Sequence, residues 1–267
     1  MKKLIRWMYK HRGLELRPVP LNPFVEQQRL LGGAGPSVIF DVGAHYGETV
    51  REYRALFPSA SIYSFEPFSA SFAVLEQTAK QDANVHAYMV ALSDCVGDSP
   101  YSVNGNSATN SLLPVAAEAS QYWGHLVQPE RVEQVSTTTI DAFCEVTGIE
   151  AIDVLKLDVQ GCEPLVLRGA ERMLRRQAVR LVYAEIIAVP CYDKQVAFDE
   201  FLAMMRSYGF LLHNFYAPHL SETGRLKQCD AIFVCGSEDR QGSLGSTCGN
   251  ESPCLKRVEK SGSVQVA

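Results

Sequence analysis

Residues 38–47 constrain the fold of this chain more than any other segment. They begin as a short apolar run rich in β-branched side chains, which is typical of a parallel strand covered on both faces. Gly43 and Gly47 then allow a tight turn, and an amphipathic helix is expected between the second glycine and Pro58. Asp41 lies near the end of the strand, at the edge where open α/β sheets bind their ligands.

From residue 38 onward, strand patterns alternate with helix patterns. This alternation implies right-handed crossovers, and therefore an α/β fold built on a Rossmann-like, mostly parallel sheet. The last two strands are joined by a polar loop, so the last strand is expected to be antiparallel and the sheet mixed. The predicted strands cover residues 38–42, 61–65, 85–92, 152–157, 181–184, 210–216 and 231–235.

Residues 96–135 interrupt this alternation. An insertion of such length in an α/β domain is often a functional lid or hairpin. A turn signal occurs at residues 104–106, and residues 132–140 are predicted to form a strand. Asn110 and Ser111 are candidates for lining a substrate pocket, the alternative being a capped turn.

The two ends of the chain differ from its centre. Residues 1–36 are expected to be a helical lead-in, with an extended linker at 17–23 and a helix at 24–31. Residues 237–267 are rich in Ser, Gly and charge, which predicts a disordered tail. Residues 1–17 are basic and include aromatic side chains. Two interpretations stay open for them: a short helix packed on the domain, or a segment in contact with an anionic membrane.

The composition argues against several classes of protein. A net charge of -5 gives no general reason to expect nucleic-acid binding, and no apolar run is long enough for a membrane span. Arg6, Lys10 and Arg12 interrupt the apolar core that a secretory signal would need. The eight cysteines show no paired spacing, so they are expected to be reduced thiols. A cytoplasmic location is therefore expected, membrane-proximal if the basic N-terminus contacts lipid.

The spacing of the glycines in the first turn discriminates between cofactors. A mononucleotide P-loop needs a lysine that this turn lacks. A dinucleotide site needs G-x-G-x-x-G, because its second glycine admits the pyrophosphate. Here Gly43 and Gly47 enclose Ala44, His45 and Tyr46, which leaves no room for a pyrophosphate. S-adenosyl-L-methionine has no pyrophosphate, and its carboxylate can bind the amides of such a turn.

Acidic residues follow three successive predicted strands and match the remaining groups of this cofactor. Asp41 is a candidate acceptor for its ammonium group, and Glu66 for both ribose hydroxyls. Asp94 can accept from the adenine amino group, with Ser93 adjacent. A single aspartate at a strand end is more often a helix cap. The predicted cofactor site therefore depends on Asp41, Glu66 and Asp94 occurring together.

Several motifs occur in order along the chain, at residues 40–47, 65–67, 91–94, 155–163, 184–186 with Tyr192, and 228–234. As a set they resemble the FkbM family of S-adenosylmethionine-dependent methyltransferases. The resemblance implies a class I methyltransferase domain over residues 37–236 and methyl transfer, usually to a hydroxyl oxygen. It implies that Asp41, Gly43, Glu66 and Asp94 hold the cofactor.

The chain departs from the family pattern at two positions. Gln160 stands where many members carry Glu, so the resemblance places no carboxylate there, and Cys162 stands where an aromatic or small residue is usual. His45 and Gly47 belong to the turn itself and are predicted to contact the cofactor; for His45 packing or hydrogen bonding is favoured over catalysis.

Methyl transfer to a hydroxyl benefits from a base within hydrogen-bond reach. Asp158, at the end of the strand 152–157, is the predicted base. Lys156 shares its face of the strand and either positions the acceptor oxygen or forms a salt bridge. Glu163 and Glu185 are further substrate-site candidates, although Glu163 fits a helix cap equally well. No metal is predicted, because no histidine spacing supports a metal site.

The predicted function is O-methylation of a hydroxyl on a glycan or on a small secondary metabolite. Two alternatives from other classes remain at this point. One is a nicotinamide-dependent oxidoreductase on a similar sheet, which the glycine spacing disfavours. The other is a non-catalytic docking module, which the intact acidic set disfavours.

Overall fold

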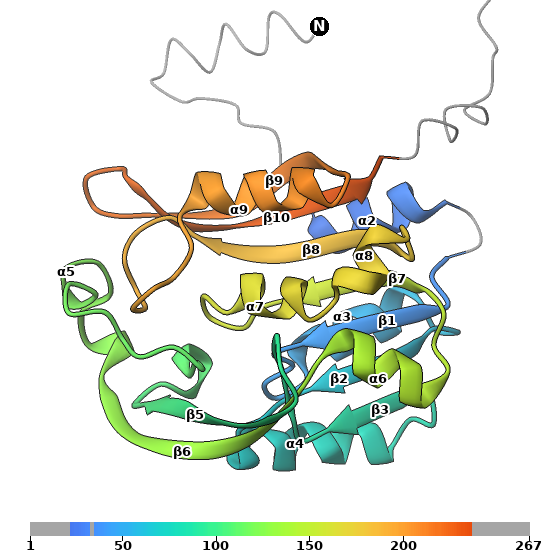
Figure 1. Ribbon diagram of the computed structural model, residues 1–267, viewed down its shortest axis with the longest axis horizontal. Coiled ribbons are helices and arrows are strands. Elements are labelled where there is room, and N and C mark those ends of the chain that lie inside the picture. Colours follow the sequence, from blue (N-terminus) through green and yellow to red (C-terminus); the bar gives the residue numbers. More distant parts are fainter. Residues whose placement is uncertain (1–21, 33–34, 237–267) are drawn as a thin grey trace, which may run out of the picture. The chain divides into compact units, whose positions relative to one another are not determined.

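A seven-stranded mixed sheet forms the centre of the computed structural model, which describes residues 22–32 and 35–236 (Figure 1). The strand order is β3-β2-β1-β7-β8-β10-β9. Neighbours are parallel from β3 to β8, whereas β10 is antiparallel to both of its neighbours. The predicted mixed sheet with an antiparallel last strand is thus confirmed. The strands are β1 (Val38–Val42), β2 (Ser61–Phe65), β3 (Val85–Tyr88), β7 (Ile152–Leu157), β8 (Val179–Ile187), β9 (Phe210–Leu220) and β10 (Leu226–Cys235).

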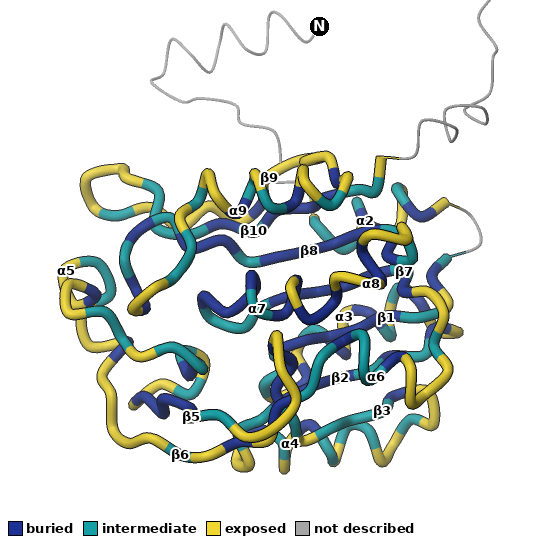
Figure 2. Tube along the Cα trace, viewed as in Figure 1, coloured by how far each residue is buried: buried dark blue, intermediate teal, exposed yellow. Residues whose placement is uncertain are grey.

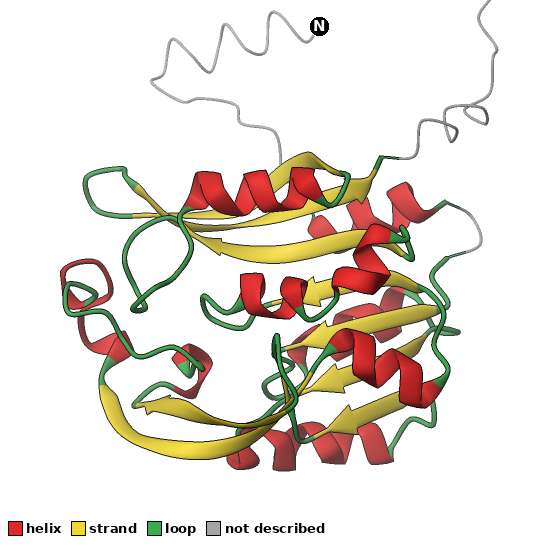
Figure 3. Cartoon of the chain, in the orientation of Figure 1, coloured by secondary structure: helices red, strands yellow, loops and turns green. Residues whose placement is uncertain are grey.

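Helices cover both faces of this sheet (Figure 3). One buried cluster joins the sheet to α6, α7, α8 and α9, and a second cluster joins the opposite face to α2, α3 and α4. The helices are α2 (Pro23–Leu31), α3 (Glu48–Leu56), α4 (Ser69–Lys80), α5 (Ser120–Trp123), α6 (Ile140–Thr147), α7 (Glu163–Arg168), α8 (Glu171–Arg175) and α9 (Phe198–Ser207).

The alternation of side chains along β1 explains why this strand lies at the centre. Ile39 points to the face covered by α2–α4, while Phe40 and Val42 point to the face covered by α6–α9. All three are essentially inaccessible to solvent. Burial on both faces is the arrangement that the apolar run predicts, and Figure 2 shows the central strands as the most buried part of the domain.

Polar side chains replace apolar ones at the carboxyl ends of the parallel strands, on the face covered by α2–α4. In register, Asp41 of β1 is flanked by Ser64 of β2 and Lys156 of β7, and Lys156 is in turn flanked by Tyr183 of β8. Since side chains alternate with a period of two, the next residues on the same face include Asp158. The carboxyl ends of the parallel strands therefore carry a row of polar side chains, next to an apolar core.

The insertion between β3 and β7 forms a second, three-stranded sheet in the order β4-β6-β5. Here two strand predictions are wrong in detail. The strand predicted at 85–92 is two strands, because the chain leaves the large sheet after Tyr88 and β4 then pairs with β6. The strand predicted at 132–140 ends at Thr138, since Thr139 caps α6 by accepting from the Ala142 N–H. The further elements are β4 (Ala91–Leu92), β5 (Gly97–Asn104), β6 (Pro129–Thr138), η1 (Ser107–Thr109) and η2 (Gly124–Val127).

The β9–β10 hairpin is longer than the two strands predicted at 210–216 and 231–235. Residues predicted as a polar loop are instead paired, with Leu226 opposite Leu220 and Gln228 opposite His219. Polar composition lowered the expectation of a strand, but backbone pairing against β8 and β9 does not require apolar side chains. The longer hairpin reaches the polar edge of the sheet.

The predicted helix at 24–31 is confirmed and packs on the domain. Asn22 caps its N-terminus, so the linker predicted to reach Pro23 ends earlier. Phe24 contacts the rings of Tyr53 and Tyr183 edge to face. The predictions for residues 1–17, most of the linker and the tail 237–267 fall outside the described residues. Within 22–32 and 35–236, no helix has the length and apolar composition needed to cross a membrane.

Candidate active site

A cavity of about 510 Å³ lies where the carboxyl ends of β1, β2, β7 and β8 meet the insertion and the β9–β10 hairpin. This volume is in the range of small-molecule and cofactor pockets. The structure brings part of the predicted set to its wall, namely Gly43, His45, Glu66, Asn110, Lys156, Asp158 and Glu185. Other predicted residues do not line it, namely Asp41, Gly47, Ser93, Asp94, Ser111 and Glu163.

The glycine turn forms the floor of the cavity and tolerates no side chain at its first position. Gly43 has φ +77, and a Cβ there would lie 1.9 Å from the backbone oxygen of Asp158. The Gly43 carbonyl accepts a hydrogen bond of 3.0 Å from Nζ of Lys156. The turn is therefore held against the end of β7, and its backbone faces the cavity.

Glu66 follows β2 and is anchored by the backbone on both carboxylate oxygens. Oε2 accepts from the His45 N–H and Oε1 from the Phe68 N–H, each at 2.9 Å. Burial raises the pKa of Glu66 to about 7, although these two hydrogen bonds act in the opposite direction. A carboxylate has about four acceptor positions, so Glu66 retains capacity for the hydroxyl groups of a ligand.

His45 joins the glycine turn to the insertion. Its backbone has φ 48, and its ring Nε2 lies 2.9 Å from Oγ of Ser107 in η1. Tyr46 stacks on the imidazole and its hydroxyl reaches the same Ser107. Burial lowers the pKa of His45, which favours the neutral ring. These contacts agree with a positioning function rather than with acid–base catalysis.

Lys156 forms a buried ion pair beneath the turn. Its Nζ lies 3.2 Å from Oδ1 of Asp41 and 3.5 Å from Oδ2 of Asp158. Burial alone would lower the pKa of Lys156, but the carboxylates of Asp41 and Asp158 outweigh burial and raise it above its ordinary value. The salt-bridge alternative for Lys156 is thus the one present in the structure.

Asp41 was predicted to contact the ammonium group of the cofactor, but its side chain does not line the cavity. The strand period directs its side chain into the α2–α4 face, where it is fully buried beside Lys156. Neither carboxylate oxygen has a hydrogen-bond partner among the described residues. Asp41 is near the end of β1, as predicted, but it is buried and does not line the cavity.

Asp158 and Glu185 face the cavity from neighbouring strands and share a partner. The Gln160 amide nitrogen donates to Oδ1 of Asp158 at 3.0 Å and to Oε2 of Glu185 at 2.7 Å. Glu185 also accepts from Nε2 of Gln228 at 2.9 Å. Burial and the nearby Asp158 charge raise the pKa of Glu185 well above its ordinary value. Burial therefore favours the protonated form of Glu185.

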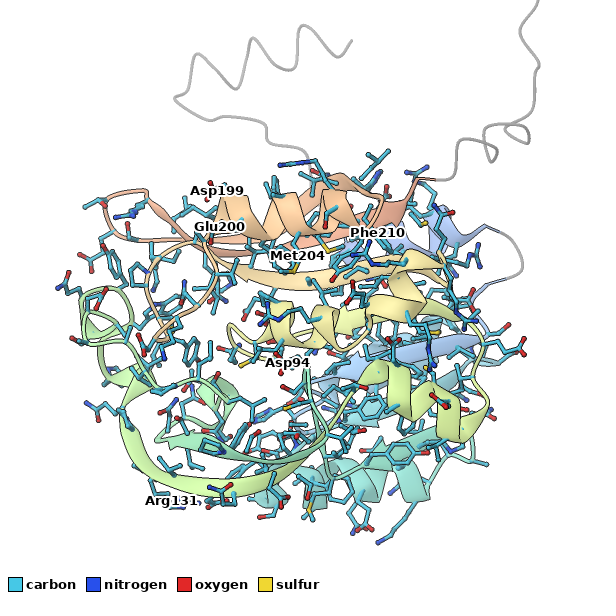
Figure 4. All side chains as sticks on the ribbon, in the orientation of Figure 1. Asp94, Arg131, Asp199, Glu200, Met204 and Phe210 are labelled. Carbon is cyan, nitrogen blue, oxygen red and sulfur yellow. The ribbon has the colours of Figure 1, made fainter. Side chains whose placement is uncertain are left out.

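Asp94, the predicted adenine contact, lies outside the cavity. Its carboxylate is 3.5 Å from Nε of Arg168, the last residue of α7, and Figure 4 shows Asp94 beside that helix. Ser93 is buried and donates to Asp94 at 3.4 Å. The cavity wall nearest to β4 is apolar instead, formed by Phe65, Val90, Ala91, Leu92 and Tyr101.

The other predicted residues off the cavity have structural contacts. Gly47 has φ +79 and begins α3. Ser111 donates to the Gln160 carbonyl at 2.8 Å. Glu163 accepts from the Val159 N–H at 2.9 Å at the start of α7, and burial raises its pKa to about 7. Glu163 lies in the first turn of α7, but this contact is to the preceding loop and is not a helix-cap bond.

The prediction from sequence missed the wall contributed by the hairpin and by α5–η2. Lys227 lies over the ring of Trp123, with 4.3 Å from Nζ to the ring centroid, and Trp123 donates to the Pro190 carbonyl. His219 and Gln228 also line the cavity. The motif at 228–234, which includes Gln228, was the available signal for this wall.

Among the residues that the structure describes, no group of three or more His, Cys, Asp or Glu side chains is placed to hold an ion.

The sheet order, the glycine turn and the carboxylate that follows β2 define a class I methyltransferase. The chain belongs to the FkbM methyltransferase family: the model of the methyltransferase FkbM domain matches residues 41–212. S-adenosyl-L-methionine is accordingly the cofactor. The match does not favour the nicotinamide oxidoreductase or the docking module.

The chain is similar to two curated relatives and to solved structures. The chain is 26% identical over 176 residues to the 2-O-methyltransferase NoeI of Sinorhizobium fredii, covering 64% of this chain and 72% of the relative. It is 27% identical over 224 residues to the 31-O-demethyl-FK506 methyltransferase FkbM of Streptomyces tacrolimicus, covering 76% of each. Fibrillarin from Aeropyrum pernix, solved with bound S-adenosyl-L-methionine, superposes with TM-score 0.43 at 13% identity, over 87% of this chain and 74% of that one.

The chemistry of the cavity wall fits this cofactor. The strands β3, β2, β1 and β7 are successive neighbours in the sheet, so the residues that follow them line the cavity in the same order. The lining is apolar next to β3, Glu66 and the turn at Gly43 come next, and Asp158 follows β7. An adenine ring suits the apolar part, and the ribose diol suits the anchored carboxylate of Glu66. The residues that would hold the cofactor are thus Glu66 and the backbone of the turn.

Proposed function

We propose that this protein methylates a hydroxyl oxygen of a glycan or of a small secondary metabolite, with Asp158 as the general base. One observation carries the proposal: the Asp158 carboxylate faces the cavity while it is held between Lys156 and Gln160. A neutral hydroxyl is a weak nucleophile until its proton leaves, so a fixed carboxylate beside it has a direct chemical use.

Two relatives support an oxygen acceptor. The names of both the Sinorhizobium and the Streptomyces enzyme describe methylation at oxygen. These relatives match this chain at about one residue in four, so the class of reaction is carried over and the particular acceptor is not.

The wall opposite the turn suits a polyhydroxylated acceptor. It combines amide and basic side chains from the hairpin with the ring of Trp123 from the insertion. Planar polar groups such as Asn110 and Gln228 can pair with hydroxyls, and an aromatic ring can pack on the apolar face of a sugar. The acceptor is therefore proposed to enter between the insertion and the hairpin.

The cofactor supplies an electrophilic methyl group when it is bound. Asp158 would receive the proton of the acceptor hydroxyl on a carboxylate oxygen, which leaves the acceptor oxygen free to take the methyl group. Lys156 fixes Asp158 and the Gly43 carbonyl, so that the base and the turn keep one geometry. The surrounding elements position the acceptor and exclude water, which is the main contribution an enzyme makes to such a transfer.

Two further features are part of this proposal. The methyltransferase domain is taken as residues 37–236, preceded by a lead-in and followed by a tail. A cytoplasmic location is supported by cysteines that are buried as thiols, among them Cys144, Cys162 and Cys191.

The experiment is a transfer assay with methyl-tritiated cofactor against a panel of pyranosides, oligosaccharides and polyhydroxylated macrocycles. We expect label in at least one hydroxyl compound and a rate roughly 10²–10⁴-fold lower for Asp158→Asn, with cofactor affinity retained. Asp193→Asn, an exposed aspartate of the 190s loop, is the matched control and should keep full activity. Transfer to amines but not to hydroxyls, or full activity of Asp158→Asn, would contradict the proposal.

A further inference from the structure

Gln160 adopts a backbone conformation that side chains rarely take. Its φ is 55, and the following residue, Gly161, has φ +86. A left-handed conformation costs a non-glycine residue roughly 1–2 kcal/mol. Such conformations persist where the surrounding contacts determine them, and they concentrate at functional sites. The contacts of the Gln160 side chain show what this conformation achieves.

The Gln160 amide connects three partners at once. Its nitrogen donates to Oδ1 of Asp158 and to Oε2 of Glu185, which uses both of its N–H groups. Its oxygen accepts from the hydroxyl of Tyr192 at 3.0 Å. This partner set fixes the orientation of the amide, because the opposite orientation would bring its oxygen against two carboxylates.

The same residue is bound to the insertion. The Tyr192 hydroxyl also lies 2.8 Å from the Thr109 carbonyl, so its single proton is shared between that carbonyl and the Gln160 amide oxygen. Ser111 donates to the Gln160 carbonyl at 2.8 Å. A Cβ on Gly161 would lie 3.0 Å from the Tyr192 ring, so that ring packs directly on the backbone beside Gln160. The position of the amide therefore depends on both the insertion and the 190s loop.

The charged groups around the two carboxylates differ. On β7, Lys156 lies 3.5 Å from Oδ2 of Asp158, so Asp158 has a cation on one oxygen and the amide on the other. Glu185 has amides on both oxygens, and no ion pair to it is found among residues 22–32 and 35–236. Lys156 acts on its charge without being in contact. From α7 and β10, Glu163 and Asp230 add negative potential at Glu185.

We propose that Gln160 is a positioning residue that joins Asp158 and Glu185 into one acid–base pair, in which Asp158, the carboxylate that Lys156 contacts, is the base. This inference rests on the proposed function, because the pair is useful only if a hydroxyl proton is to be removed. Glutamine suits the task for a reason of charge: an amide donates to both carboxylates, whereas a carboxylate at this position would repel them.

The pair can be tested without the acceptor, by comparing two cofactor forms that differ in charge. S-adenosylmethionine is a cationic sulfonium and S-adenosylhomocysteine a neutral thioether, so their affinity ratio reports the negative charge near the sulfur. We would measure both dissociation constants by calorimetry from pH 5 to 8.5. In the unmodified protein the preference for the cation should rise with pH and show a midpoint, where the pair loses its proton.

Gln160→Leu removes both N–H donors and should raise this midpoint by about one to two pH units, because hydrogen bonds to a carboxylate stabilise its charged form. Gln160→Glu should raise it as well, since it adds a third carboxylate. Gln81→Leu is the matched control, because Gln81 is exposed at the C-terminal end of α4 and does not line the cavity. It should leave the midpoint unchanged.

Two results would overturn the inference even if the cofactor binds. One is an affinity ratio of the two cofactor forms that does not change with pH in the unmodified protein. The other is the same midpoint in Gln160→Leu as in the unmodified protein. If the unmodified protein binds neither compound at millimolar concentration, the proposed function is overturned together with it. Thermal unfolding of each variant, measured alongside, separates a folded protein with a shifted midpoint from an unfolded one.

Discussion

The buried pair of Lys156 and Asp41 should be essential to the stability of the domain. Lys156 is 5% exposed and Asp41 is 0% exposed, and their charged atoms are 3.2 Å apart. Replacing Lys156 by Met leaves the Asp41 carboxylate buried without a counter-charge. Removing one partner of a buried pair costs about 3–5 kcal/mol. For a domain of this size each kcal/mol lowers Tm by roughly 2–4 °C, so we expect a fall of roughly 6–20 °C.

The assay is differential scanning calorimetry at pH 7 with two comparison variants. Lys80→Met breaks an exposed ion pair with Glu76, and should cost no more than about 1 kcal/mol. The double variant Asp41→Val with Lys156→Met removes both charges and should recover most of the loss, because apolar replacements of buried pairs are often neutral. Equal losses in Lys156→Met and Lys80→Met, or a double variant as unstable as the single one, would refute the reasoning.

Three further outcomes follow from the same geometry. In the unligated protein, folded Glu66 keeps its proton up to about pH 7, whereas the unfolded chain loses it near pH 4.5. The folded state then binds more protons between these values, so stability falls by about 3 kcal/mol as pH rises through this window; in Glu66→Gln, urea titrations should show a correspondingly smaller fall. Gly43→Ala should abolish cofactor binding and destabilise the domain strongly, while Gly224→Ala, which has φ +83 but open space, should cost only about 1–2 kcal/mol in thermal unfolding. Asp94→Ala should change the dissociation constant of the cofactor less than about threefold in calorimetry, because its partner is Arg168, and a larger change would restore Asp94 as a direct contact.

The central sheet was predictable because its signals are local. β1 is an apolar run covered on both faces, and the glycine turn follows it directly. The close approach of Asp158 that excludes a side chain at Gly43 is visible only in the structure. The antiparallel last strand followed from a hairpin after alternating units. The prediction of one strand at 85–92 was wrong, because the apolar run continues after Tyr88 although the chain there moves to a second sheet.

The cavity wall was only partly predictable, because a residue's position relative to the last residue of its strand decides whether its side chain reaches the cavity. Glu66 and Asp158 lie beyond the last residues of their strands and face the cavity, whereas Asp41 lies one residue too early and is buried. Gln160 was set aside because it lacks a charge, yet its value depends on contacts with Glu185 and Tyr192 that are distant in sequence. The helix α6 was missed although Thr139 and Gly148 provide ordinary capping signals.

The most direct test of the account is the affinity of S-adenosylmethionine for the unmodified protein, for Glu66→Ala and for Glu76→Ala. Glu66 is anchored by two backbone N–H groups and faces the cavity, whereas Glu76 lies exposed on α4 beside Lys80. Charge-assisted hydrogen bonds from two ribose hydroxyls make Glu66 worth about 3 kcal/mol, so Glu66→Ala should weaken binding roughly 100-fold while Glu76→Ala leaves it unchanged. Equal affinities for the unmodified protein and Glu66→Ala would contradict the assignment of this cavity to the cofactor.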